Sequence, residues 1–300
     1  MRCHWNPVSL LLAGLLLVPA VYAENEVETQ WLFDAEVSTV YDDNIGRAER
    51  ERDIVDDKML RGSFAASYIR EISVEQVLTL RAFVESEFVR YVDGLSHVAA
   101  GAQFVYRWQH RMGLFAPFYQ FNTSIRLKEY DVEQRDVTAY SSQLLVSRRL
   151  TDRVLATVGF EYQREVSDGI VFDQKRARVF ANADYTNRTG WAFYGTYSYI
   201  HGDVWSTSQD SFCNGAPALD IFNLVAQAAA IEPDEAFNKA YCGSWLAYRL
   251  PANVNMLVLG INKPLGRRVA LDVSAAHIRV NAVANEYNVS SFNASLLLRF

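Results

Sequence analysis

Charged side chains stand at even spacings within several segments of this 300-residue sequence, and they are the residues with which it could act on a solute. An even spacing places side chains on one face of a β-strand, because a strand repeats every two residues. The set that shares this feature carries both signs in similar amounts: Arg81, Glu85, Glu87, Arg107, Arg126, Lys128, Arg149, Glu161, Glu165, Arg178 and Asp184. Around a water-filled lumen these groups would line a channel, with no preference for anions or cations. Alternatively, they would pair across the lumen and fill it.

Two cysteines, Cys213 and Cys242, stand in the least regular part of the sequence. In an exported protein such a pair predicts a disulfide bond. Closing a loop of roughly 30 residues in this way would stabilise it by about 3–4 kcal/mol. A zinc site is the weaker interpretation, because no Cys-x-x-Cys spacing or histidine cluster stands nearby. We therefore expect no metal site and no cofactor.

A single run, His201-Gly202-Asp203, is suggestive of hydrolysis. A hydrolytic site requires a nucleophile, a histidine and an acid, or an acid and a histidine that face a water molecule. No nucleophile is identifiable beside this run, so no catalytic residue is expected. The acidic segment from Asp42 to Asp57 could attract a hard cation, but it lacks a regular ligand spacing and predicts a solvated loop.

The elements that must position these residues are β-strands. From Thr29 onward, apolar and polar side chains alternate in segments of roughly ten residues or more. Short connections, expected at 70–73, 110–113, 151–153, 186–190 and 264–268, alternate with longer ones. This pattern predicts an all-β protein, a transmembrane antiparallel up-and-down barrel of about 12 strands, with 10 or 14 as alternatives. The alternation breaks at 201–251, which predicts one long, disulfide-tied outer loop.

The first 23 residues have the pattern of a secretory signal peptide. Arg2 precedes a short apolar core from Val8 to Val18, and small residues end at Ala23. The predicted domains are therefore a signal peptide at 1–23 and a barrel at 24–300. No later apolar run has the length of a membrane-spanning helix, so strands must make any membrane crossing. The net charge of −6 argues against nucleic acid as a partner.

The position of the aromatic residues indicates which face of the strands meets lipid. A soluble barrel with an apolar interior would show the same alternation of side chains. Here, however, aromatic residues concentrate at the ends of the apolar faces: Trp31, Tyr41, Tyr68, Trp108, Tyr140, Tyr162, Tyr185, Trp191 and Tyr199. This distribution is typical of the interfacial girdles of a barrel in a membrane. It predicts that the apolar faces point outward and the charged faces point into the lumen.

The last segment, from Ser291 to Phe300, alternates in the same way and ends on an aromatic residue, with Phe292, Leu298 and Phe300 on its apolar face. It resembles the closing strand of Gram-negative outer-membrane β-barrels. The run Tyr41-Asp42-Asp43-Asn44 resembles a short motif of uncharacterised proteobacterial surface barrels. The resemblance implies an outer-membrane location after transit of the periplasm. It also implies contact with lipid and lipopolysaccharide, and recognition of the terminal residues by the barrel-assembly machinery.

The combined expectation is a porin-like channel for the passive passage of small hydrophilic solutes. The alternative is a non-conducting surface barrel for binding, adhesion or envelope structure, and an outer-membrane hydrolase is a distant third hypothesis. The long loop at 201–251 is expected to act as a lid, a plug or a binding surface, because loops of this length often carry function.

Overall fold

The computed structural model describes residues 29–111, 113–209, 212–213, 216–217, 227–283 and 285–300. The predicted signal peptide at 1–23 lies outside the described residues. No helix within the described part is long and apolar enough to cross a membrane.

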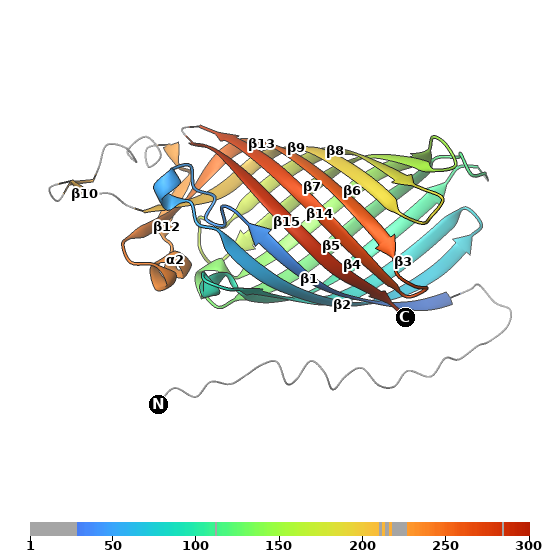
Figure 1. Cartoon of the computed structure of the whole chain (residues 1–300), viewed down its shortest axis with the longest axis horizontal. Helices are drawn as coiled ribbons and strands as arrows, with labels where there is room; N and C mark the ends of the chain where they lie inside the picture. Colours follow the sequence, from blue (N-terminus) through green and yellow to red (C-terminus); the bar gives the residue numbers. More distant parts are fainter. Residues whose placement is uncertain (1–28, 112, 210–211, 214–215, 218–226, 284) are drawn as a thin grey trace, which may run out of the picture.

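The described chain forms a closed barrel of twelve long strands (Figure 1). Their bounds are β1 (Thr29–Asp42), β2 (Asp57–Ser73), β3 (Gln76–Val89), β4 (His97–Gln109), β5 (Phe118–Tyr130), β6 (Val137–Arg149), β7 (Val154–Ser167), β8 (Gln174–Thr186), β9 (Ala192–Gln209), β13 (Trp245–Pro264), β14 (Val269–Ala282) and β15 (Asn285–Arg299). Each strand pairs antiparallel with its neighbours, and β9 pairs directly with β13. The predicted fold and strand number are confirmed.

The first and last strands close the barrel. Tyr41 is opposite Phe292, and the ladder runs on to Asp34 opposite Arg299. Beyond it, the Phe300 amide donates to the Phe33 carbonyl at 2.8 Å. Closure leaves no open edge on which another strand could pair. Phe292 and Phe300 are exposed on the outer surface, and the recognition of Phe292, Leu298 and Phe300 by an assembly machinery stays a prediction.

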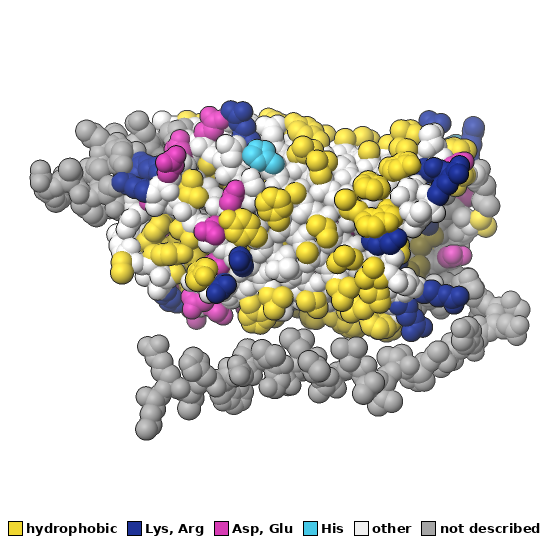
Figure 2. Space-filling model, in the orientation of Figure 1, with side chains coloured by type: hydrophobic (Ala, Val, Ile, Leu, Met, Phe, Trp, Pro, Cys, Tyr) yellow, Lys and Arg dark blue, Asp and Glu magenta, His cyan; other side chains and the backbone are white. Residues whose placement is uncertain are grey.

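The outside of the barrel is apolar. Large hydrophobic side chains that alternate along the strands are exposed to the surroundings, for example Leu60 and Phe64 on β2, and Leu257 and Leu259 on β13. Figure 2 shows such side chains scattered over the middle of the wall, with lysine and arginine mainly towards its two ends. A closed sheet with an apolar outer band is the form in which β-strands cross bacterial outer membranes. The protein is therefore located in the bacterial outer membrane.

The two ends of the barrel differ in their connections. At one end the strands are joined by short turns, such as the turn at 265–268 between β13 and β14. We call this the short-turn end. At the other end the connections carry short elements: η2 (Glu51–Asp53), η3 (Asp93–Leu95), η4 (Glu133–Arg135), β10 (Phe212–Cys213), β11 (Ala216–Pro217), β12 (Ala230–Pro233) and α2 (Glu235–Ala240). Figure 1 shows β12 and α2 together at this end.

The irregular segment is shorter than the predicted loop at 201–251. β9 continues to Gln209 and β13 starts at Trp245, with His201 opposite Asn253 and Gln209 opposite Trp245. These strand extensions lack the apolar–polar alternation because they project beyond the apolar band, so the sequence pattern could not reveal them. The connection proper spans 210–244.

The predicted disulfide bond between Cys213 and Cys242 is not present in this structure. The Cys242 side chain is an exposed free thiol. The prediction was wrong because it rested on the redox compartment and on residue number, and neither brings two Cβ atoms within bonding distance. The connection is held instead by the packing and polar contacts described below.

Candidate channel lumen and its outer cap

The charged residues singled out in the sequence lie on the face opposite the exposed apolar side chains. Arg81, for example, stands between outward-facing Leu80 and Ala82, and register carries the same alternation onto the neighbouring strands. The predicted lumen residues that share this parity are Arg81, Glu85, Glu87, Arg107, Arg126, Lys128, Glu161, Glu165 and Arg178. The strands thus direct the whole set to the interior, although a role in conduction stays a prediction.

Many of these charges form ion pairs along the wall. Arg178 lies 3.2 Å from Glu161, and both belong to the adjacent strands β7 and β8. Three further pairs join neighbouring strands or strands one apart: Arg61 with Glu87, Arg126 with Glu85 at 3.6 Å, and Arg176 with Glu165 at 3.1 Å. Pairing along the wall neutralises charge without drawing side chains across the lumen. These pairs therefore lie along the wall, whereas the second interpretation from the sequence expected pairs across the lumen.

An interior cavity of about 440 Å³ lies beside two of these pairs. Its charged lining comprises Glu36, Arg61, Glu85, Glu87, Arg126 and Lys128. His97 also lines it, 4.0 Å from Glu87. This space, which we call the upper cavity, holds as many basic as acidic side chains, not counting the histidine.

A second cavity of about 440 Å³ lies at the short-turn end, and we call it the lower cavity. Its charged lining comprises Asp34, Glu36, Arg81, Arg267, Arg268 and Arg299. Glu36 lines both spaces, so the two cavities meet at this residue of β1. Sequence reasoning missed Arg267 and Arg268, because they belong to a turn rather than to the alternating pattern of a strand.

One side of the lumen is apolar, a feature that sequence reasoning also missed. Buried Ala252 and Val254 of β13 pack with Val280 of β14 and Val289 of β15. Register places these side chains opposite to outward residues such as Leu257 and Phe292. The interior therefore has charged side chains from β2 to β8 and an apolar patch at the cap end of β13 to β15, whereas the same strands carry the inward polar residues Asp272, Asn293 and Ser295 nearer the short turns. Short runs such as Val254, Met256 and Val258 carried this signal, but the alternating leucines of the outer face dominate the same segment.

The longer connections pack together over the barrel end opposite the short turns. We call the described parts of them, residues 43–56, 90–96, 131–136, 168–173 and 227–244, the outer cap. Their apolar core buries Val92, Val132 and Phe237 with at most 1% of each side chain exposed. Phe237 of α2 comes from the β9–β13 connection, whereas Val92 and Val132 come from connections on the other side of the barrel. The cap therefore spans the outer mouth.

A buried ion pair joins opposite sides of the cap. Arg135 donates to Asp234 Oδ2 at 2.7 Å, and both side chains are almost completely buried. Asp234 also accepts from Thr207 Oγ1 at 2.6 Å, and it caps the first turn of α2 through the Phe237 amide. The Arg135 guanidinium lies 4.0 Å from the centre of the Phe172 ring. We call Arg135–Asp234 the cap ion pair.

Further polar contacts hold the 227–244 segment against other connections. The Val171 amide donates to Glu232 Oε1 at 3.1 Å, and Gln134 Nε2 donates to the Pro233 carbonyl at 2.9 Å. Asp53 of η2 is fully buried, and this burial raises the pKa of its carboxyl, although Arg52, 3.4 Å away, opposes the change. The segment predicted to be a lid is thus docked through side-chain contacts and through the pairing of β12 with β13, rather than through a disulfide.

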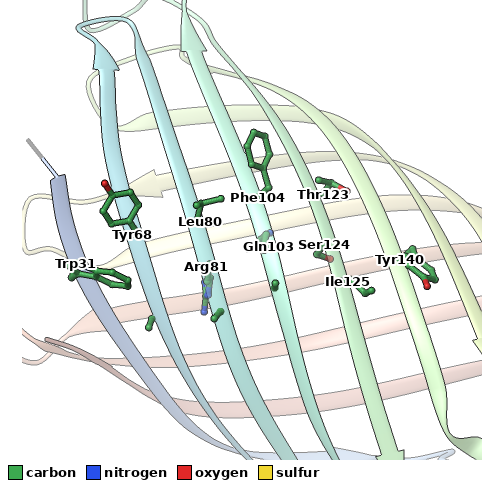
Figure 3. Close-up of a pocket in the computed structure, with 13 residues that line it drawn as sticks. Trp31, Tyr68, Leu80, Arg81, Gln103, Phe104, Thr123, Ser124, Ile125 and Tyr140 are labelled. Atoms are coloured by element: carbon green, nitrogen blue, oxygen red, sulfur yellow. The ribbon is translucent and has the colours of Figure 1, made fainter. Parts of the chain in front are cut away.

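Another hollow, of about 840 Å³, lies on the outer face of the barrel and not in the lumen (Figure 3). Its rim consists of outward aromatic and aliphatic side chains: Trp31, Tyr68, Leu80, Phe104, Ile125 and Tyr140. Its floor is shallow because Ala66, Ala82 and Ala102 are neighbours in register on β2, β3 and β4. This hollow faces the membrane and is not part of the candidate channel.

The suggestive histidine run also lies outside the lumen. His201 Nδ1 is 2.9 Å from Asn253 Oδ1, which also accepts from the Tyr199 hydroxyl at 2.8 Å. The side chains of Tyr199, His201 and Asn253 lie on the outward face of the paired strands β9 and β13, towards the end that carries the cap. Their partners are amide and phenol groups, so the structure assembles no nucleophile–histidine–acid group there.

No protein-family model matches the sequence, and no curated protein is similar to it. Solved structures of outer-membrane barrels are similar to it. An outer-membrane channel from Pseudomonas putida F1 is 10% identical, with a TM-score of 0.56, over 95% of this chain and 100% of that chain. The KdgM porin is 9% identical, with a TM-score of 0.44, over 89% of this chain and 99% of that chain. The first similarity shows that the chain has the fold of outer-membrane channel barrels.

Proposed function

We propose that this protein is a gated channel for the passive passage of small hydrophilic solutes across the outer membrane. The observation that carries the proposal is the pair of adjacent interior cavities, each about 440 Å³ and lined by charged side chains, which share Glu36 in their linings. A barrel whose interior served only as a packed core would fill this space with side chains. The outer-membrane channel of similar fold supports the same interpretation.

The outer cap is the gate in this proposal. It covers the mouth opposite the short turns, and its apolar core excludes water from the path of a polar solute. A solute could pass only when the 227–244 segment moves away from the connections that carry Val92 and Arg135. The 227–244 segment is joined to the strand ladder through β12, which pairs with Leu246–Arg249 in the extension of β13 beyond the closed wall. Releasing this short pairing would leave the wall intact.

The amphipathic lumen favours solutes that combine a polar or charged group with an apolar part. The charged side chains would hold the polar group, and the apolar patch near Val254 and Val280 would face the remainder. Purely apolar molecules gain little, since the paired arginines and carboxylates would lose hydration as such a molecule passes.

Liposome swelling tests this function. Refolded protein in liposomes should admit small amino acids and monosaccharides and exclude larger oligosaccharides. Swelling should accelerate when Phe237→Ala removes a side chain from the core of the cap. The proposal would be contradicted if liposomes with the wild type and liposomes with this variant both swelled no faster than protein-free liposomes.

A further inference from the structure

The two interior cavities differ in their balance of charge. The upper cavity is lined by three basic and three acidic side chains, and two of its ion pairs, Arg61–Glu87 and Arg126–Glu85, lie within it. The lower cavity is lined by four arginines and two carboxylates. A net positive charge therefore belongs to the lower cavity alone.

Ion pairing within the lower cavity leaves its net positive charge unchanged. Arg299 Nε donates to Asp34 Oδ1 at 2.9 Å, so these two charges neutralise each other. Within the described part of the chain, Arg81, Arg267 and Arg268 form no ion pair with any carboxylate. Glu36 is the other carboxylate of the lining, and it too has no ion pair among these residues. Three arginines thus face one free carboxylate.

The three arginines approach the cavity from different directions. Arg81 lies on the inner face of β3, whereas Arg267 and Arg268 belong to the turn between β13 and β14, and strands β15, β1 and β2 lie between the two positions. Asn262, which also lines the cavity, uses its side-chain amide to donate to Asp272 Oδ2 at 3.2 Å. A solute leaving the lumen at this end must pass among these groups.

We infer that the lower cavity is an anion site that makes the channel select small organic carboxylates. The inference rests on the proposed channel function and names its solute class. A guanidinium group presents two parallel N–H donors that match the two oxygens of a carboxylate. Low-dielectric barrel walls concentrate the field of unpaired charges inside the pore. The upper cavity, being neutral, does not oppose the entry of an anion.

Reversal potentials in a KCl gradient test the selectivity. The expected result is a preference for chloride over potassium. It should fall by about threefold in Arg81→Gln, because the net charge of the lining drops from +2 to +1 and local ion concentrations depend exponentially on the potential. The matched control is Arg188→Gln, which removes an arginine from the β8–β9 turn at the same end but outside the cavity lining. It should leave the potential unchanged. Cation preference in the wild type, or equal shifts in both variants, would overturn the inference.

Binding in detergent tests the site without any need for conduction. Succinate should bind the refolded wild type and Arg188→Gln, and should bind Arg81→Gln several-fold more weakly in isothermal titration calorimetry. The combination of succinate binding with no conductance would refute the channel and retain the site. The reverse combination, conductance without binding or anion preference, would refute the site and retain the channel.

Discussion

The barrel wall and the outer cap are both well packed, but different interactions hold them together. The wall is a continuous antiparallel ladder in which every strand has two partners, and its closure through β1 and β15 leaves no edge. The cap has short backbone pairings, such as β12 with the extension of β13 and the Gly169 amide with the Gln134 carbonyl at 2.8 Å. Its parts are otherwise held by side chains that come from connections far apart in the sequence, such as Arg135 and Asp234.

This difference bears on how easily each part of the molecule can open. Opening the wall would expose many backbone groups at once, and a membrane offers them no water. Opening the cap requires that one apolar core, a few side-chain contacts and the short β12–β13 pairing separate, and local opening of this kind costs less than global unfolding. The proposed channel thus combines a rigid wall with a cap that can open locally.

The largest expected effect comes from breaking the cap ion pair. Asp234→Ala removes the partner of the buried Arg135 guanidinium and the cap of the first turn of α2. Leaving a buried charge without its partner costs about 3–5 kcal/mol. We expect limited proteolysis to cut 227–244 much faster, while the barrel keeps its heat-modifiable migration on gels.

The control for this experiment is Asp152→Ala, which removes an exposed carboxylate from the β6–β7 turn at the other end. It should leave the cleavage rate of the cap unchanged. Equal protection of the cap in the Asp234 variant and the wild type would show that the ion pair does not hold it.

A matched pair of glycine substitutions distinguishes the two regions. A Cβ on Gly101 of β4 would lie 2.6 Å from the Ile125 carbonyl oxygen, and one on Gly94 of the cap would lie 2.8 Å from Ala236 Cα. Such overpacking costs about 1–3 kcal/mol. Gly101→Ala should lower the thermal transition of the barrel, whereas Gly94→Ala should speed cap proteolysis alone.

Gly266→Ala is the control for both glycine variants, since a Cβ there would meet no neighbouring atom. If Gly94→Ala lowered the barrel transition as much as Gly101→Ala did, the cap and the wall would be one cooperative unit, contrary to this account.

The smallest expected effect is a dependence of the cap on pH. Burial raises the pKa of the Asp53 carboxyl, so the docked cap binds a proton more tightly than an undocked one does. Its contribution is greatest below the ordinary aspartate pKa and is lost as the pH rises through the raised value. Hydrogen exchange in 43–56, corrected for intrinsic rates, should be slower at about pH 4, near the ordinary aspartate pKa, than at about pH 7.

Asp53→Asn removes the titrating group and should abolish this difference. A cap that exchanges equally at both pH values in the wild type, or one that keeps its pH dependence in the variant, would refute the role of Asp53.

The wall could be predicted from the sequence because its physics is local. Alternation along each strand is visible in residues such as Leu80 and Arg81, and the lipid-facing side follows from the aromatic girdle. Even closure was predictable, since Phe300 ends an apolar face that would otherwise form an exposed edge.

The cap could not be predicted, because its contacts join residues with no local pattern. Nothing near Arg135 in the sequence indicates a partner at Asp234, and the side chains that contact them come from the β7–β8 connection (Phe172) and from strand β9 (Trp205 and Thr207). The same limit explains the unforeseen role of Arg267 and Arg268, and the wrong disulfide prediction for Cys242. The number and sign of the charges could be read from the sequence. Which of them form ion pairs, and that Arg81 forms none with the described carboxylates, could be seen only in the structure.

The most direct test of the central claim is single-channel conductance of the refolded protein in planar bilayers, compared between the wild type and Asp234→Ala. A channel covered by a displaceable cap predicts rare or brief openings in the wild type and long-lived openings in the variant, with the same unit conductance because the wall is unchanged. Silence in both proteins, with the barrel folded, would contradict the account and indicate a closed lumen. Steady and identical conductance in both would show that the cap does not gate the channel.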